Sequence, residues 1–282
     1  MKLFGLLGYP VGHSASPAMM NAAFQAQNEA AVYLPFAVPP EQIEVALNGL
    51  QALGAVGVNV TIPHKRSAYA WVKQRTAEAE LVGAVNTVRF TADGAIGHNT
   101  DVSGWWKSVA PYVQSNQPRV VIIGAGGAAM AILAAIASQR PSAHVVMAAR
   151  RENAVDDLRQ LFAHRLTIHY ATWEARASEI AQADLIIQTT PIGMWPAIAQ
   201  SPVEDAGVFS AGQVVQDIVY RPRQTQFMRL AAEQGATVVD GVSMLVYQGV
   251  DAYEWWLDKK APVDTMFAAV NDKLVAEQTE HE

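Results

Sequence analysis

The feature of the sequence that most constrains its fold is a glycine-rich turn between an apolar run and an alanine-rich one. Residues 120–123 are four branched apolar residues and predict a buried strand, and the alanine-rich residues after the turn predict a helix. The turn consists of small residues: Gly124, Ala125, Gly126, Gly127 and Ala128. In this context Gly124 permits a tight turn, Gly126 lets the backbone approach a pyrophosphate, and the free N–H groups of the helix start bind phosphate. The pattern therefore predicts a dinucleotide-binding unit.

Strand and helix patterns alternate along most of the chain. Strands are expected at residues 2–8, 33–38, 56–62, 84–90, around 96, 119–123, 144–150, 166–170, 184–189, 214–219 and 237–239. Helices are expected at residues 16–27, 40–53, 105–113, from 127, at 154–162, 243–257 and 262–277. Such alternation predicts an α/β fold with mostly parallel sheets.

A chain of 282 residues favours two domains. Residues 105–241 are predicted to form a Rossmann-like dinucleotide-binding domain. The final helices follow it without a strand of their own, so we expect them to return to the first domain. The substrate-binding domain would then comprise residues 1–104 and 242–282, with the active-site cleft between the two domains.

Composition excludes several classes of function. The net charge of −6 gives no general attraction to nucleic acid or anionic lipid, so neither is an expected partner. The absence of cysteine excludes disulfides, thiolate metal sites and cysteine nucleophiles, and we expect no metal. The amino-terminal apolar run is too short for a signal peptide or a membrane span, which favours a cytoplasmic protein.

The second strand of the dinucleotide-binding unit ends at Ala149, Arg150 and Arg151. An NAD-preferring domain usually carries a carboxylate there, whereas two guanidiniums favour a phosphate on the ribose. NADP is therefore the expected cofactor, with NAD as the alternative. The loop that contains Thr189 and Pro191 follows a later strand of the same sheet and is expected to support the nicotinamide.

Small polar residues gather where the strands of the first domain end, a composition that suits a polyol acid. They are Ser14, Ser16, Asn59, Thr61, His64, Lys65, Asn86, Thr87, Asn99, Thr100 and Asp101. Hydroxyls near a helix start suit a carboxylate. Ser16, just before Pro17, also has the pattern of a helix N-cap, whereas Ser14 shows no such structural role.

Lys65 and Asp101 are the candidate catalytic residues. Lys65 is expected in the first turn of a helix, where the macrodipole disfavours the cationic form of lysine and a nearby carboxylate would orient it. Both conditions serve a proton shuttle. Asp101, delivered from another loop, is the expected partner. Taken singly, a solvated lysine and a helix-capping aspartate are the alternatives.

Eight linked motifs then identify a family. GHSASP, GVNVTIPHK, GAVNT, HNTD, GAGGAA, TTPIGM, DIVY and DGVSMLVYQ have the order and spacing of the shikimate dehydrogenase family. The resemblance implies NADP-dependent, reversible reduction of 3-dehydroshikimate to shikimate in chorismate and aromatic amino-acid biosynthesis.

The resemblance also implies individual roles. Ser14 and Ser16 match a pair that binds the substrate carboxylate, and Tyr220 matches a tyrosine near it. Contacts to the ring hydroxyls are matched by Thr61, Asn86, Asp101 and Gln248. Lys65 and Asp101 match the catalytic pair, while Ile218 and Gly241 match positions that line the nicotinamide.

The chain departs from the family pattern at two places. Ala149 begins the turn after the second strand of the dinucleotide-binding unit, and Ala154 stands where a basic residue is usual. Val102 stands where glycine usually follows the Asn-Thr-Asp motif. Three alternatives therefore stay open: a quinate/shikimate dehydrogenase paralogue that also accepts NAD, a methylene-tetrahydrofolate dehydrogenase-like enzyme, and a non-catalytic NADP-binding protein. Either a monomer or a homodimer fits the sequence.

Overall fold

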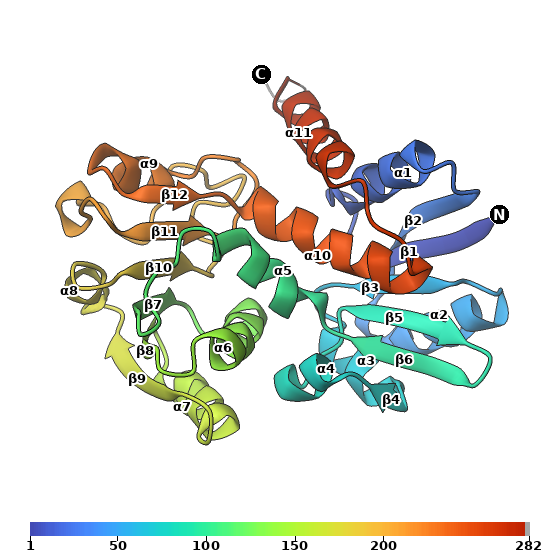
Figure 1. Cartoon of the computed structure of the whole chain (residues 1–282), viewed down its shortest axis with the longest axis horizontal. Helices are drawn as coiled ribbons and strands as arrows, with labels where there is room; N and C mark the ends of the chain where they lie inside the picture. The colour runs from blue at the N-terminus through green and yellow to red at the C-terminus, as the bar shows by residue number, and fades with distance from the viewer. Residues whose placement is uncertain (280–282) are drawn as a thin grey trace. The chain divides into compact units, whose positions relative to one another are not determined.

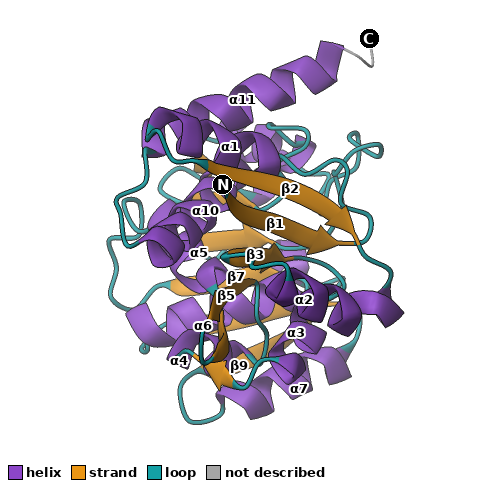
Figure 2. Ribbon diagram, turned by 90° about the vertical axis from the view of Figure 1, so that its right-hand side faces the viewer, coloured by secondary structure: helices purple, strands orange, loops and turns teal. Residues whose placement is uncertain are grey.

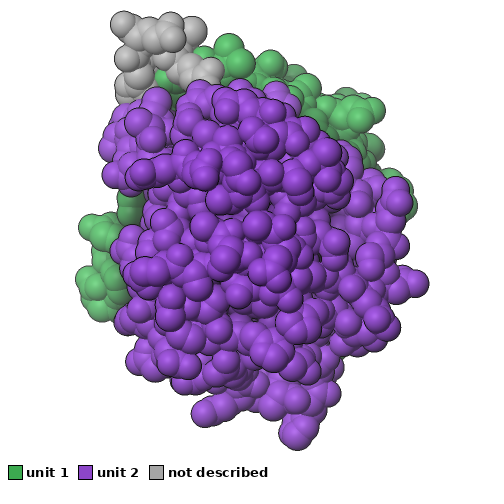
Figure 3. Space-filling model, turned by 90° about the vertical axis from the view of Figure 1, so that its left-hand side faces the viewer, with its two compact units in different colours: residues 1–104, 246–282 green, residues 105–245 purple. Residues whose placement is uncertain are grey.

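The computed structural model describes residues 1–279, which form two compact units (Figure 3). Unit 1 comprises Met1–Gly104 and Val246–Glu282, and unit 2 comprises Trp105–Leu245. The chain passes between the units within α5 (Thr100–Val109) and again within α10 (Gly241–Leu257). The α/β prediction is confirmed, since each unit contains one sheet with helices around it (Figure 1).

The sheet of unit 1 has six strands in the order β2-β1-β3-β5-β6-β4. Their bounds are β1 Lys2–Gly8, β2 Ala31–Ala37, β3 Gly57–Val60, β4 Gln74–Arg75, β5 Thr87–Thr91 and β6 Gly94–His98. The pairings β1–β2, β1–β3 and β4–β6 are parallel, but β3–β5 and β5–β6 are antiparallel. The expectation of a mostly parallel sheet is confirmed, and β5 is the exception, because a tight turn with Gly94 at φ 124° folds β5 and β6 into a hairpin.

Helices cover both faces of this sheet (Figure 2). They are α1 Ser16–Ala26, α2 Ile43–Ala52, α3 Lys65–Trp71, α4 Ala77–Val82 and α11 Val263–Thr279. Leu7 packs with α2, α3 and α4 in one buried cluster. Phe4, on the opposite face of the same strand, packs against Phe24 of α1 and Trp256 of α10 with tilted rings. This alternation follows the two-residue period of a strand.

The last two helices contribute to unit 1. α11 packs along α1 (Figure 1). Trp256 of α10 donates its indole N–H to the carbonyl of Val88 at 3.0 Å. A Cβ atom on Gly57 would lie 2.2 Å from the same indole nitrogen, so only glycine lets α10 sit this close to β3.

Unit 2 contains a six-stranded, fully parallel sheet in the order β12-β11-β10-β7-β8-β9. The strands are β7 Arg119–Ile123, β8 His144–Ala149, β9 Thr167–Thr172, β10 Leu185–Gln188, β11 Val214–Asp217 and β12 Thr237–Val239. Read from β9, the order reverses direction after β7, as in the doubly wound dinucleotide-binding fold. The predicted Rossmann-like architecture is therefore confirmed.

Helices α6 Gly127–Gln139, α7 Glu152–Phe162, α8 Arg176–Ile180 and α9 Gln226–Glu233 complete unit 2. Short 3-10 turns occur at Ala206–Val208, and in unit 1 at Pro40–Gln42. Val121 and Phe227 belong to the buried cluster between the sheet and the α8–α9 side. No helix in the described part of the chain combines the length and the apolar character that crossing a membrane requires.

One predicted helix start and one predicted helix cap are wrong. The helix expected from Trp105 begins at Thr100, because the side chains of Asn86 and Asn99 accept the N–H groups of Thr100 and Asp101. The helix expected to be capped by Ser16 begins at that residue, and Ala15 occupies the cap position without a side-chain bond.

Candidate functional site

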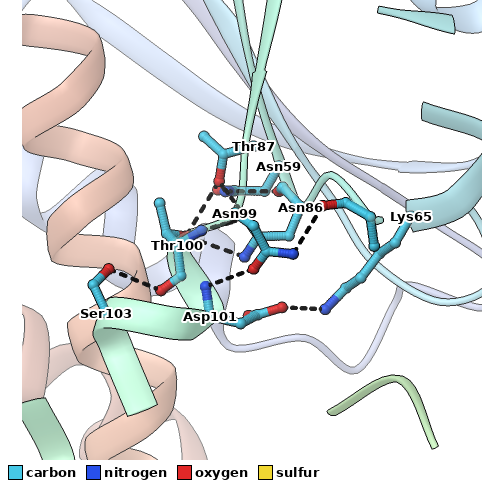
Figure 4. A network of polar contacts seen from close by, with 9 residues as sticks. Asn59, Lys65, Asn86, Thr87, Asn99, Thr100, Asp101 and Ser103 are labelled. Atoms are coloured by element: carbon cyan, nitrogen blue, oxygen red, sulfur yellow. Dashed lines mark hydrogen bonds and ion pairs between the residues drawn. The ribbon is translucent and has the colours of Figure 1, made fainter. Parts of the chain in front are cut away.

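The candidate catalytic residues of unit 1 form an ion pair. Lys65 Nζ donates to Asp101 Oδ2 at 2.6 Å, and Figure 4 shows the two side chains pointing toward each other. Lys65 is the first residue of α3, and Asp101 lies in the first turn of α5. Their side chains are 28% and 13% exposed. A substrate hydroxyl can therefore reach the pair, and the N-terminus of α5 favours the Asp101 carboxylate.

Asparagine side chains fix the start of α5 and hence the position of Asp101. Asn99 Oδ1 accepts the Asp101 N–H at 3.2 Å, and Asn99 Nδ2 donates to the Ala84 carbonyl at 2.9 Å. Asn86 Oδ1 accepts the Thr100 N–H at 2.8 Å. Two N–H groups that the helix leaves unpaired are thus satisfied by side chains from outside it.

A buried network lies behind this helix start (Figure 4). Asn86 Nδ2 donates to Thr100 Oγ1 at 3.0 Å, and Thr87 Oγ1 donates to Asn86 Oδ1 at 2.9 Å. Asn59 Nδ2 donates to Thr87 Oγ1 at 3.0 Å, and Tyr33 Oη donates to Asn59 Oδ1 at 2.8 Å. Asn59 and Thr87 therefore have structural roles in this network.

Asn86 belongs to the same network. It is only 3% exposed, so its predicted contact to substrate has to coexist with these internal bonds. His64 is also structural, since it is 1% exposed and its Nε2 lies 2.7 Å from the Val38 carbonyl oxygen.

Ser14 has a structural role that the sequence did not suggest. Its Oγ accepts the N–H of Ser16 at 3.2 Å, which shapes the entry to α1. Ser16 is buried, whereas Ser14 and Thr61 are partly exposed. Thr61 follows β3 and lies against Gly8, where a Cβ would be only 2.5 Å from the threonine methyl group. The loops after β1 and β3 thus meet at the same edge of the sheet.

Gln248 is carried by α10 close to α5. A Cβ on Gly104 would lie 2.6 Å from the Gln248 backbone nitrogen and 2.7 Å from its Cα, so the two helices touch at this glycine. Gly104 is one helical turn from Asp101. Ser103 Oγ also donates to Asp251 Oδ2, which ties the same two helices together. Tyr220, in contrast, belongs to unit 2 and follows β11.

The glycine-rich turn in unit 2 has the predicted geometry. Gly124 has φ 107°, and a Cβ there would lie 2.7 Å from Thr189 Oγ1, so both conformation and space require glycine. Gly126 is the N-cap of α6, and Cβ atoms on Gly126 and Gly127 would meet nothing within 4 Å. Ala128 is half-buried in the first turn of α6. The exposed helix start fits a pyrophosphate group.

A cavity of about 380 Å³ adjoins this turn. Predicted cofactor residues on its wall are Gly124, Ala125, Gly126, Arg150, Arg151 and Pro191. Ala149, Ala154, Trp173, Thr190 and Ile192 complete the lining. Both arginines are exposed. The cavity combines an exposed helix start with two cations, a combination suited to a phosphorylated nucleotide.

The remaining predicted cofactor residues lie on loops after β10, after β11 and at the start of α10. Thr189 Oγ1 donates to the Ile123 carbonyl at 2.8 Å and so closes the loop onto β7. A Cβ on Gly241 would lie 2.5 Å from the Ile218 carbonyl oxygen, so these two residues, both predicted to line the nicotinamide, are in close contact.

Gln188 and Asp217, which sequence analysis overlooked, join the loops after β10 and β11. Gln188 Nε2 donates to the carbonyls of Thr190 and Ile192 at 2.9 and 3.0 Å and lies 3.4 Å from Asp217 Oδ1. Burial raises the pKa of Asp217 to about 7, although bonds from Val219, Thr225 and Gln188 act in the opposite direction.

Family models match three parts of the chain. One described as the shikimate dehydrogenase substrate binding domain matches residues 6–88, and one described as the shikimate 5'-dehydrogenase C-terminal domain matches residues 241–270. Residues 107–198 match the alanine dehydrogenase/PNT C-terminal domain.

Full-length relatives extend this match. Shikimate dehydrogenase (NADP(+)) of Symbiobacterium thermophilum is 40% identical over 273 residues, covering 95% of this chain and 93% of that protein. A crystal structure of a shikimate dehydrogenase in complex with NADP+ has a TM-score of 0.90 at 34% identity and covers 97% of this chain and 96% of its own. Quinate dehydrogenase from Corynebacterium glutamicum in complex with NAD gives 0.87 at 28% identity, with coverages of 96% and 99%.

Proposed function

Because the chain belongs to the shikimate dehydrogenase family, we propose that it catalyses the reversible NADP-dependent reduction of 3-dehydroshikimate to shikimate, a step of chorismate and aromatic amino-acid biosynthesis. The observation that carries the proposal is the Lys65–Asp101 pair, held at 2.6 Å and partly exposed. A non-catalytic NADP-binding protein has no need for such a pair. Membership of this family also argues against a methylene-tetrahydrofolate dehydrogenase-like enzyme.

The proposed chemistry moves one hydride and one proton. Bound NADP supplies the nicotinamide that exchanges the hydride with the ring carbon. In reduction, the Lys65 ammonium gives its proton to the carbonyl oxygen, which becomes the hydroxyl. In oxidation, the neutral amine of Lys65 takes that proton back. Asp101 accepts a hydrogen bond from the substrate hydroxyl and keeps the Lys65 side chain oriented.

The other polar residues bind the substrate in this proposal. Ser14 and Ser16 bind the carboxylate with Tyr220, while Thr61, Asn86 and Gln248 contact the ring hydroxyls. Support comes from the meeting of the β1 and β3 loops at one sheet edge and from the contact of Gln248 with α5. Ser14 and Asn86 would each serve the substrate while keeping an internal bond.

The proposed cofactor site uses the residues of unit 2. Gly124, Ala125, Gly126, Gly127 and Ala128 receive the pyrophosphate, and Arg150 with Arg151 binds the ribose phosphate. Thr189, Pro191, Ile218 and Gly241 support the nicotinamide. The open space beside Gly126 and Gly127 fits this assignment, as does the absence of a carboxylate at the end of β8.

A quinate/shikimate dehydrogenase that also accepts NAD is the second candidate. Ala154 on the cavity wall favours it, since the cavity then has one cation fewer than the family pattern would supply. The similarity to a quinate dehydrogenase crystallised with NAD favours it as well.

We extend the proposal to a cytoplasmic enzyme whose partners are small molecules and which is a monomer or a homodimer. The proposed reaction uses a diffusible biosynthetic substrate and a diffusible cofactor, which suits that compartment. Light scattering of the purified protein decides between the two oligomeric states.

Steady-state kinetics of three variants test the mechanism. Lys65→Ala should lower kcat by about 10² to 10⁴ and leave the KM for shikimate nearly unchanged, because a general acid–base residue acts in the transition state. Asp101→Asn should lower kcat and raise KM together. Ser14→Ala should act mainly on KM. Near-normal kcat with a large rise in KM for Lys65→Ala would make Lys65 a binding residue and refute the proposed proton transfer.

A further inference from the structure

Trp173 is the large side chain on the cavity wall that sequence analysis did not identify. It follows β9 and lines the same cavity as Gly124, Arg150 and Arg151. The residue is half-buried, so part of its surface reaches the cavity.

Two arginines lie over the Trp173 ring. The guanidinium carbon of Arg150 is 5.3 Å from a ring centroid of Trp173, and that of Arg176 is 4.4 Å from it. Both distances are within the range of cation–π attraction. The ring therefore contacts the arginine that is expected to bind the ribose phosphate.

Arg176 is itself anchored. It donates through Nε to the Pro202 carbonyl and through Nη1 to the Trp173 carbonyl. Arg176, Trp173 and Arg150 also line a second cavity, of about 570 Å³. Because Arg150 lines the cavity beside the glycine-rich turn as well, the Trp173 ring contacts one anchored arginine and one arginine that reaches that cavity.

We propose that Trp173 is a positioning residue for cofactor choice, which holds the Arg150 guanidinium ready for the ribose phosphate of NADP. An exposed arginine otherwise loses side-chain freedom when it binds a ligand, and prior contact with the ring lowers that loss. Within residues 1–279, no such partner is found for Arg151. The inference rests on the proposed function, because it assumes that Arg150 binds the phosphate.

The two cofactors distinguish this role from general support of the cavity. NADP and NAD share the adenine and differ in the ribose phosphate. A ring that positions Arg150 affects NADP alone. Direct stacking of Trp173 on the adenine would affect both cofactors equally.

The test measures KM and kcat with each cofactor for Trp173→Ala, Trp173→Phe, Arg150→Ala and the double variant Trp173→Ala/Arg150→Ala. Trp173→Ala should raise the KM for NADP about two- to fivefold, with kcat and the KM for NAD unchanged. Trp173→Phe should restore most of the loss. In the Arg150→Ala background, Trp173→Ala should have no further effect.

Melting temperatures of all variants show whether the fold is intact. If Trp173→Ala unfolds, Trp173→Leu replaces it, with the same expected rise in the KM for NADP. Leu161→Ala, at an exposed apolar residue of α7 away from the cavity lining, is the matched control. An equal effect on NADP and NAD, or full additivity with Arg150→Ala, would overturn the positioning role. If Arg150→Ala leaves the KM for NADP unchanged, the proposed phosphate contact is itself wrong. If Arg150→Ala raises the KM for NADP and Trp173→Ala does not, the proposed role of Trp173 is refuted and the phosphate contact of Arg150 stands.

Discussion

The proposed substrate end in unit 1 and the proposed cofactor end in unit 2 are built in different ways. In unit 1 the candidate catalytic side chains are held by other side chains, as Asn86 and Asn99 hold the start of α5. In unit 2 the backbone forms most of the surface, through a glycine at φ 107° and an exposed helix start. Substitutions should therefore act through lost hydrogen bonds in unit 1 and through added atoms or lost charge in unit 2.

The largest expected effect concerns the buried carboxylate of unit 2. Burial raises the pKa of Asp217 from 3.8 to about 7. Between these two pH values the Asp217 carboxyl is protonated in the folded chain and ionised in the unfolded chain. Stability from this group is complete below pH 4 and is lost as pH rises toward 7. The slope is about 1.4 kcal/mol per pH unit, or about 4 kcal/mol over the window.

Asp217→Asn removes this titration. Urea unfolding at several pH values should give a flatter stability profile between pH 4 and 7 for the variant than for the wild type. Asp205→Asn, at an exposed cap of a short 3-10 turn, is the control. Parallel profiles for Asp217→Asn and wild type would show that Asp217 does not titrate in this window.

Next in size is the loss of charge at the cofactor end. Replacing both Arg150 and Arg151 with alanine should raise the KM for NADP roughly ten- to a hundredfold, because losing a charge-assisted contact to the ribose phosphate costs about 1.5 to 3 kcal/mol. The KM for NAD should change far less. An equal rise for both cofactors would contradict the assignment of the ribose phosphate to these arginines.

Substitutions at two glycines of the same turn distinguish the requirement for a backbone conformation from the requirement for space beside the ligand. Gly124→Ala should lower stability by about 1 to 3 kcal/mol, since alanine at positive φ is strained and its Cβ would meet Thr189. Gly127→Ala adds a methyl group in open space, so it should keep the melting temperature and weaken NADP binding. Comparable melting temperatures for both variants would be evidence against a backbone-built site.

An effect of the same size is expected in the side-chain network of unit 1. Asn86→Ala leaves the buried N–H of Thr100 without its acceptor, which should cost about 1 to 3 kcal/mol in unfolding free energy. It should also lower kcat, because the start of α5 carries Asp101. Asn116→Ala, at an exposed asparagine, is the control and should stay within about 0.5 kcal/mol of wild type. Full stability of Asn86→Ala would show that the network does not support the site.

Local patterns predicted much of the architecture. The run before Gly124 and the alanine-rich run after it specify a strand, a turn and a helix through neighbouring residues alone, and the structure has all three. Lys65 and Asp101 were paired on the expectation that loops of one sheet meet, and they do form an ion pair. Their catalytic roles stay predictions.

Features that depend on contacts between distant residues were missed. The early start of α5 depends on Asn86, fourteen residues before Thr100, and the antiparallel β5 depends on which strands become neighbours. The sequence does not reveal that the Ser14 hydroxyl accepts a hydrogen bond from the N–H of Ser16. Trp173 carries no local signal, because only the folded sheet brings it to Arg150. Side-chain partners across the fold cannot be read from hydrophobic periodicity.

The most direct test of the central claim is turnover of the purified wild-type chain with shikimate and with quinate, each supplied with NADP and with NAD. The account predicts the highest kcat/KM for shikimate with NADP, because unit 1 carries the Lys65–Asp101 ion pair and unit 2 carries two arginines that we propose bind the ribose phosphate. Turnover only with quinate and NAD, or none with any of the four combinations, would contradict it.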